Sequence, residues 1–217
     1  MIASSEPEEG KTTIAANLAV TLAQGENRVL LLDADMRRPN VHKKLGISNR
    51  VGLSDLIRGK LSLQEVTQIS KQLKNLHVIT SGSLPPNPSE LIASRRMALI
   101  IEALRKRYDM VLIDTPPAIV SDSQVLSTKS DGVLFVIRPG KTRAITVKTP
   151  LEEFSRIEAN VIGVVMNRIP RNRSYYYGGY DYYEPKPHID EKYYRSGYKD
   201  NQPNQPEDLN STGTAGQ

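Results

Sequence analysis

The sequence predicts a doubly wound α/β domain, in which a mostly parallel β-sheet carries helices on both faces. Three observations predict it. Short apolar runs rich in Val, Ile and Leu recur at wide spacing, helical patterns lie between them, and both patterns stop near residue 170. Strands that alternate with helices in this way are typical of parallel α/β folds. We therefore expect one domain over residues 1–170 and a tail over residues 171–217.

Several runs have the length and composition of strands that are buried on both faces of a sheet. Each is short and almost wholly apolar, with many β-branched residues. The runs are Val29–Leu32, Leu76–Ile79, Met110–Ile113, Val133–Ile137 and Val161–Met166. Residues 1–4 are expected to add a short strand at the start of the chain.

Helical periodicity fills the segments between these runs. The first helix is marked by Ile14, Ala15, Leu18, Ala19 and Leu22, which recur every three or four residues. Gly25 is well placed to end it. A second helix is predicted from about Ser89 to Arg107, with Leu91, Ile92, Met97, Ile100, Ile101 and Leu104 facing inward. Pro150 falls inside a later helix, and its missing N–H is expected to kink or restart that helix.

Composition excludes several classes of function. The chain has no cysteine, which excludes disulfides, thiolate metal sites and a cysteine nucleophile, and fits a cytosolic compartment. No apolar run approaches the ~18 residues of a membrane span, and no signal peptide is visible. The net charge of +5 suits an anionic ligand or a membrane surface, but is also common on a solvated face. Without a basic stripe interleaved with aromatics, nucleic-acid binding is not expected.

A phosphate-binding loop is predicted near the start of the chain. Gly10, Lys11 and Thr12 match the end of the pattern Gly-x-x-x-x-Gly-Lys-Ser/Thr, although Ser5 stands where the first glycine would be. A short strand precedes this loop and a strong helix follows it, as the pattern requires. Lys11 would neutralise phosphate charge and the Thr12 hydroxyl would hold Mg²⁺. The alternative is a surface loop with a chance Gly-Lys-Thr.

Two later strands end in carboxylates. Asp114 follows the apolar residues of VLIDTPP (111–117), and Asp33 and Asp35 follow those of VLLLDADMRRP (29–39). Ligands bind outside the carboxyl ends of strands in open α/β sheets, so these carboxylates are expected beside the phosphates. Alternation places Asp33 and Asp35 on the same side of the chain. One could position Mg²⁺ while the other accepts a proton from an incoming hydroxyl; turn or helix-capping roles are the alternative.

A tyrosine-rich tail follows the domain. Its aliphatic residues are only Ile189 and Leu209, so it cannot bury enough apolar surface to offset chain entropy and is predicted to be disordered. The tyrosines of the tail are Tyr175, Tyr176, Tyr177, Tyr180, Tyr182, Tyr183, Tyr193, Tyr194 and Tyr198. A tail of this composition could be a sticky linker without enzymology; the family resemblance described next instead implies that these tyrosines are phosphoacceptors.

Together these motifs resemble those of the bacterial tyrosine kinases, or BY-kinases. SSEPEEGKTT (4–13), LLDADMRRP (31–39) and VLIDTPP are similar in order and spacing to their Walker A, A′ and B motifs. GSLPPNPSELIAS (82–94), GVVMNR (163–168) and the tail extend the resemblance to residues 2 to about 198. It implies a P-loop NTPase-type fold and an enzyme that uses ATP and Mg²⁺ to phosphorylate its own tail tyrosines in trans, within a ring of subunits.

The resemblance also implies a role for each matching residue. The nucleotide would be bound by Glu8, Glu9, Gly10, Lys11, Thr12, Thr13 and Asn167, of which Asn167 would read adenine. Lys11, Asp33 and Asp35 would be catalytic, with Asp33 as the base, and Thr12, Asp35 and Asp114 would hold the metal. Glu9 is expected to point outward. Glu8 stands where relatives often carry a small residue, and is expected to reshape or weaken the cradle.

The implied biology is the regulation of capsular and extracellular polysaccharide synthesis and export. It would take place at the inner face of the cell membrane, through a membrane adaptor or chain-length determinant that is separate or fused upstream. A cognate tyrosine phosphatase would be a further partner. In relatives an upstream helix builds the ring, whereas this sequence starts at the first strand. A misplaced start, a fragment and impaired ring formation all stay open.

Two other functions stay open. The first is a partition-like or septum-site-like ATPase switch that hydrolyses ATP to water. Glu6 disfavours it, because those ATPases carry a signature Lys at this place. The second is a catalytically weak regulatory subunit of a polysaccharide copolymerase, which would bind nucleotide without turnover.

Overall fold

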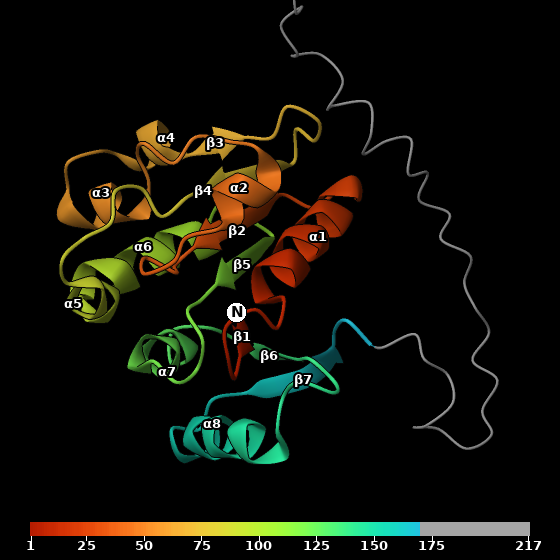
Figure 1. Ribbon diagram of the computed structural model, residues 1–217. Coiled ribbons are helices and arrows are strands. Elements are labelled where there is room, and N and C mark those ends of the chain that lie inside the picture. The colour runs from red at the N-terminus through yellow and green to blue at the C-terminus, as the bar shows by residue number, and fades with distance from the viewer. Residues whose placement is uncertain (170–217) are drawn as a thin grey trace, which may run out of the picture. The chain divides into compact units, whose positions relative to one another are not determined.

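The computed structural model describes residues 1–169. They form a seven-stranded sheet with helices on both faces, which confirms the predicted α/β class (Figure 1). The expectations of disorder over residues 171–217 and of nine acceptor tyrosines lie outside the described residues.

The sheet has the strand order β3-β4-β2-β5-β1-β6-β7. The strands are β1 (Ile2–Ser4), β2 (Val29–Asp33), β3 (Gln68–Ile69), β4 (Leu76–Ile79), β5 (Met110–Asp114), β6 (Val133–Ile137) and β7 (Val161–Met166). All neighbours within the described sheet pair in parallel except β3, which pairs antiparallel with β4. Every predicted run therefore forms a strand. β3 was not predicted, because two residues, one of them polar, carry no periodic signal.

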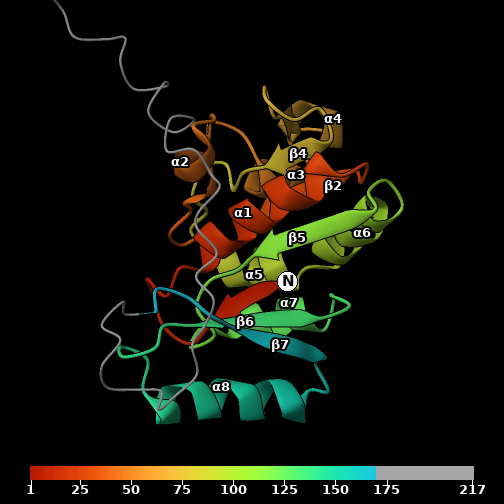
Figure 2. The ribbon, with the colours of Figure 1, turned by 90° about the vertical axis from the view of Figure 1, so that its right-hand side faces the viewer.

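Helices cover the two faces unequally, as the turned view shows (Figure 2). The helices are α1 (Lys11–Gln24), α2 (Val41–Leu45), α3 (Leu53–Arg58), α4 (Leu63–Val66), α5 (Pro88–Ala93), α6 (Arg95–Arg105), α7 (Ser121–Ser127) and α8 (Ala144–Arg156). The apolar side chains of α1 and α2 pack with one face of the sheet, and those of the other six pack with the opposite face. Within residues 1–169, no helix has the length and hydropathy needed to cross a bilayer.

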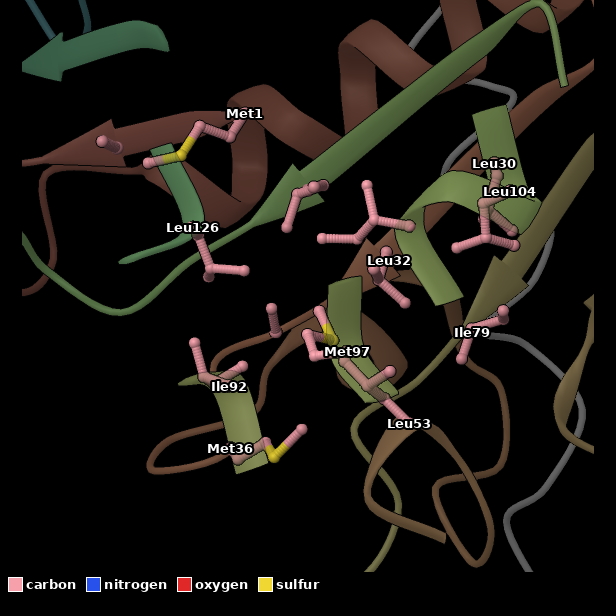
Figure 3. Close-up of a cluster of buried hydrophobic side chains, with 14 of the residues drawn as sticks. Met1, Leu30, Leu32, Met36, Leu53, Ile79, Ile92, Met97, Leu104 and Leu126 are labelled. Atoms are coloured by element: carbon pink, nitrogen blue, oxygen red, sulfur yellow. The ribbon is translucent and has the colours of Figure 1, made fainter. Parts of the chain in front are cut away.

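The larger core cluster lies between the sheet and the six helices on this face, and Figure 3 shows part of it. Leu30 and Leu32 of β2 point toward Leu104 and Met97 of α6, and all four side chains are fully buried. Leu31, between them in sequence, belongs to the cluster on the other face. Each such side chain stabilises the fold by about 1.5–3 kcal/mol. Burial on both faces explains why β2 reads as a continuous apolar run.

The predicted single helix over residues 89–107 is wrong, because Ser94 divides it into α5 and α6. The backbone of Ser94 is extended, with φ −62° and ψ 150°. Its hydroxyl accepts a hydrogen bond from the N–H of Met97 at 3.2 Å and so caps α6. The residues expected to face inward do so, since each is buried or packs against the core.

Two further expectations need correction. β7 is an edge strand on which Ile162, Val164 and Met166 are exposed, so it is not buried on both faces. α8 continues through the buried Pro150, so the helix does not restart there, and a kink at this residue stays a prediction. The end of α1 at Gly25 is confirmed, although this glycine is extended, with φ −74°, and not left-handed.

Candidate functional site

A cavity of about 830 Å³ lies at the edge of the sheet where β1, β2 and β5 end. It is formed by the loop before α1, the loop after β2 and the loop after β5. Its volume is in the range of small-molecule and cofactor sites. A second cavity of about 510 Å³, between α3, α4 and α6, contains none of the predicted site residues.

The structure brings the predicted site residues together in two layers. Those that line the larger cavity are Glu8, Gly10, Lys11, Thr12, Thr13 and Asp35. Glu9, Asp33, Asp114 and Asn167 do not line it. Of these four, the three carboxylates are almost completely buried. The buried layer supports the lining layer through the contacts described below.

The loop before α1 requires a glycine at its end. Gly10 has φ 100°, a left-handed conformation that favours glycine. A Cβ at this position would lie 1.9 Å from Nδ2 of Asn167, which no real contact allows. The same Asn167 amide donates a hydrogen bond to the carbonyl of Glu9 at 2.9 Å. Its own N–H donates to the carbonyl of Ile137 at 2.9 Å, so Asn167 connects the loop to the end of β6.

The expectation that Glu9 points outward is wrong. Its side chain is 1% exposed. One carboxylate oxygen accepts the N–H of Glu6 at 2.9 Å, and the other accepts the hydroxyl of Thr142. Glu9 therefore links two positions within the loop before α1 and also connects that loop to the segment before α8. Two adjacent glutamates would be expected to repel a phosphate, but the Glu9 carboxylate is turned into the protein, where it serves as an internal hydrogen-bond acceptor.

Glu8 behaves differently from Glu9. Its side chain is 77% exposed and lies 3.4 Å from Nζ of Lys141. An exposed pair of this kind contributes little to stability. The backbone of Glu8 is left-handed, with φ 67°, which costs a side chain other than glycine about 1 kcal/mol. That Glu8 weakens the cradle stays a prediction.

Lys11 and Asp114 form a buried ion pair beneath the cavity. Nζ of Lys11 lies 2.8 Å from Oδ1 of Asp114, and the two side chains are 7% and 0% exposed. Burial raises the pKa of Asp114, and the Lys11 ammonium, followed by the Thr12 hydroxyl, opposes this shift. Oδ2 of Asp114 is buried and has no hydrogen-bond partner among the described residues. A buried oxygen without a partner is uncommon, and it leaves Asp114 with an oxygen that is available to a metal ion or a water.

Asp33, the last residue of β2, and Asp35, in the loop after it, lie at different depths. Asp33 pairs in register with Asp114 on the neighbouring strand and is fully buried. Its two oxygens accept the N–H groups of Asp35 and Val41, each at 3.2 Å. Burial, followed by the nearby Asp114 carboxylate, raises the pKa of Asp33 to about 8. Asp35 lines the cavity and receives the N–H groups of the two arginines that follow it, so it is the more accessible carboxylate.

The oxygen ligands at this edge fit Mg²⁺. Thr12 and Asp35 line the cavity, and Asp114 carries the unpartnered oxygen. Among residues 1–169, no three carboxylate or imidazole side chains form a ready-made metal cage. Mg²⁺ does not need one, since it commonly binds one or two carboxylates together with phosphate oxygens and water.

The sequence motifs also contain residues whose place at the site was not predicted. Nε of Arg37 donates to the carboxylate of Asp122 at 3.0 Å, and its Nη2 donates to the hydroxyl of Ser89 at 2.8 Å. These contacts join the loop after β2 to α7 and α5. Beyond Arg37, the exposed cations Arg38, Lys43 and Lys44 also line the cavity. The only signal for them was the basic run that follows DAD in the sequence.

Comparison with known proteins gives concordant results. A family model described as an AAA domain matches residues 7–161. The chain is 40% identical to tyrosine-protein kinase YwqD of Bacillus subtilis (strain 168) over 190 residues, which are 86% of this chain and 80% of that protein. It is 39% identical to tyrosine-protein kinase Wzc of Salmonella typhimurium (strain LT2) over 195 residues, which are 88% of this chain but 27% of that protein.

A solved structure agrees with these sequence matches. The kinase domain of the Escherichia coli tyrosine kinase Etk superimposes with a TM-score of 0.76 at 37% identity. The match covers 83% of this chain and 71% of that domain. The sequence is therefore similar to most of a short relative and to about a quarter of a longer one, at 80% and 27% of their lengths.

Proposed function

The chain belongs to the family of bacterial tyrosine kinases, and we propose that it transfers the γ-phosphoryl group of ATP to tyrosines of its own tail in another copy. It is a protein-tyrosine kinase with a nucleotide-binding fold. The acceptors proposed are the nine tyrosines between residues 175 and 198. The observation that carries this proposal is the pair of Lys11 and Asp114 beneath a cavity lined by Asp35.

The loop from Glu8 to Thr13 is proposed to enclose the phosphates. Lys11 would exchange one oxygen of Asp114 for phosphate oxygens, which it can reach because it lines the same cavity. Thr12, Asp35 and Asp114 would hold Mg²⁺, which supplies charge neutralisation on the transferred phosphoryl group when bound. Asn167 would contact adenine in addition to its bond with the Glu9 carbonyl.

Asp33 is proposed as the base that accepts the phenol proton. A pKa of about 8 gives this carboxylate enough basicity for proton transfer near neutral pH. Its burial means that the phenol, or a water beside it, must reach behind Asp35. Asp35 would then combine metal binding with the positioning of the acceptor.

The wider role is proposed from the family resemblance. The kinase would regulate capsular or extracellular polysaccharide synthesis and export, beside the cell membrane. Its partners would be a membrane adaptor, further copies arranged in a ring, and a cognate tyrosine phosphatase. The transfer between copies requires at least transient self-association, since the acceptor lies in a different chain from the active site.

Intact-mass measurement after incubation with Mg-ATP tests the chemistry. The wild-type chain should gain mass in steps of one phosphate, located on residues 175–198. Lys11→Met should gain none, whereas Lys106→Met, which changes an exposed lysine directly after α6, should behave as wild type. Release of free phosphate without mass gain would instead support the ATPase switch. The absence of any turnover would support the regulatory subunit.

Transfer between copies is tested by mixing. Unlabelled wild-type chain is incubated with ¹⁵N-labelled Lys11→Met chain, so that mass separates the two. Phosphate on the heavy chain is expected, because its tail remains an acceptor. Phosphate confined to the light chain would contradict transfer in trans.

A further inference from the structure

We propose that a basic wall of the cavity selects the acceptor, so that tyrosines flanked by acidic residues are phosphorylated before those flanked by basic ones. The basic wall consists of Arg38, Lys43 and Lys44. The inference rests on the proposed kinase function and adds which tail tyrosines that site prefers.

The basic wall is free to bind an anionic ligand. Its three side chains are exposed and line the cavity, and none forms an ion pair with another described residue. Arg37, the cation next to them, is already bound to Asp122. α2, which carries the two lysines, lies on the side toward which the arrows of β1 and β5 point in Figure 2. The wall therefore stands beside Asp35, at the same edge of the sheet.

The charge around the cavity is asymmetric. The loop before α1 contributes Glu6 and Glu8 to the lining and Arg168 adds a single cation after β7, whereas the segment after Asp35 contributes the three cations of the basic wall. Lys11 is the cation proposed to bind the phosphates, and it is 7% exposed at the base of the cavity. The outer cations are thus available for the residues beside the acceptor tyrosine. A peptide with acidic neighbours is attracted to that wall, and one with basic neighbours is repelled.

The tail offers both kinds of acceptor. Tyr180, Tyr182 and Tyr183 have Asp181 and Glu184 as neighbours, and no Lys or Arg occurs from residue 174 to residue 185. The second group differs because cations are the direct neighbours of its tyrosines, although the segment as a whole is neutral. Lys192, Arg195 and Lys199 adjoin Tyr193, Tyr194 and Tyr198, whereas Asp190, Glu191 and Asp200 lie two or three residues away. The basic wall therefore favours the segment 180–184, and we expect its tyrosines to react first.

The test measures the initial rates of phosphorylation at the two groups in the full chain, by digestion and mass spectrometry after short incubations with Mg-ATP. Screened contacts between exposed charges predict about a three- to tenfold faster rate at Tyr182 and Tyr183 than at Tyr193 and Tyr194 at low ionic strength. The ratio should fall as salt is added. A ratio is used because it does not depend on the overall activity of a preparation.

Two double substitutions test this ratio of rates, one in the basic wall and one beside the acceptor tyrosines. Lys43→Gln with Lys44→Gln should lower the preference at least about twofold. The matched control, Lys71→Gln with Lys74→Gln, removes two exposed lysines that do not line the cavity and should leave the ratio unchanged. Asp181→Lys with Glu184→Lys alters only the acceptor and should slow Tyr182 and Tyr183 in a chain whose described domain is unchanged.

The outcomes separate the inference from the proposed function. Equal rates at the two groups, or a ratio unaffected by the lysine and tail variants, would overturn the selectivity and leave the kinase function standing. An absence of phosphate at every tyrosine would overturn both. The basic wall could instead bind an anionic bilayer. Weaker binding of the Lys43→Gln, Lys44→Gln chain to phosphatidylglycerol vesicles, with an unchanged ratio, would assign it to that role and overturn the proposal.

Discussion

Lys11 and Asp114 are 103 residues apart in the sequence, yet Nζ of the one lies 2.8 Å from Oδ1 of the other. The lysine comes from the first turn of α1 and the aspartate from the last residue of β5. The pair joins the loop expected to enclose phosphates to the strand end expected to hold a metal. Several measurable consequences follow from it and from the contacts around it.

Lys11→Met should destabilise the protein more at pH 8 than at pH 5. Burial raises the pKa of Asp114, and Lys11 opposes this shift, so the variant raises that pKa further. A group with a raised pKa in the folded state loses stability as pH rises, because the unfolded chain ionises first. The expected loss in unfolding free energy is about 3 kcal/mol at pH 8 and smaller at pH 5. Urea unfolding at both pH values measures it; equal losses would contradict the pairing, and Lys106→Met is the exposed control.

Asp33→Asn should flatten the dependence of stability on pH. The pKa of Asp33 rises from 3.8 to about 8 on folding, so the wild-type protein loses stability through this residue as pH rises across that window. The slope from one such group is at most about 1.4 kcal/mol per pH unit. Unfolding between pH 5 and pH 8 should show a smaller slope in the variant. An unchanged slope would mean that Asp33 is ionised throughout.

The role proposed for Asp33 also predicts how the rate of phosphorylation depends on pH. If Asp33 is the base, kcat/KM of the wild-type enzyme should rise with pH up to an apparent pKa near 8, because this ratio reports the free enzyme. Asp33→Asn should abolish phosphorylation. Retained activity in the variant would transfer the role of base to Asp35.

Glu9 and Glu8 allow the same substitution to be compared at a buried and at an exposed position of one loop. Glu9→Ala removes the buried acceptor of the Glu6 N–H and the Thr142 hydroxyl, and should cost about 2 kcal/mol of stability and weaken ATP binding. Glu8→Ala removes only an exposed contact with Lys141 and should cost less than about 1 kcal/mol. Thermal unfolding and nucleotide titration compare the two. Equal effects would mean that the buried carboxylate does not organise the loop.

Gly10 and Asn167 should show coupled substitutions. Gly10→Ala places a Cβ 1.9 Å from Nδ2 of Asn167 and forces a left-handed φ of 100° on alanine. It should destabilise the protein by about 2 kcal/mol or more. Adding Asn167→Ala removes the collision but leaves the backbone strain, so the double variant should recover part of the loss. Simple additivity of the two single effects would contradict the close contact.

The strands were predictable because a strand that is buried on both faces of the sheet is apolar at nearly every position. β2 and β6 lie inside the sheet, and their residues are continuous apolar runs for that reason. β7 has a similar composition but is an edge strand, and composition alone does not distinguish the two positions. The break at Ser94 was missed because the apolar spacing of α5 and α6 continues across it. Its local signal was a serine three residues before Met97, a capping arrangement.

At the site, the sequence predicted which residue types gather, but not their depth. Asp33 and Asp35 were placed on one side by alternation, whereas the structure buries Asp33 and leaves Asp35 on the cavity. Depth depends on partners such as Val41, which lies on a short helix without a strong sequence signal. The direction of Glu9 depends on Thr142, 133 residues away. Contacts over such separations cannot be read from local patterns.

Calorimetric titration of Mg-ATP into the full chain tests the central claim most directly, since everything else depends on nucleotide held above the pair of Lys11 and Asp114. The wild-type and Lys106→Met chains should each bind one Mg-ATP, and Lys11→Met should lose most of that affinity. Equal binding by the wild-type and Lys11→Met chains, or no binding by a folded wild-type chain, would contradict the account.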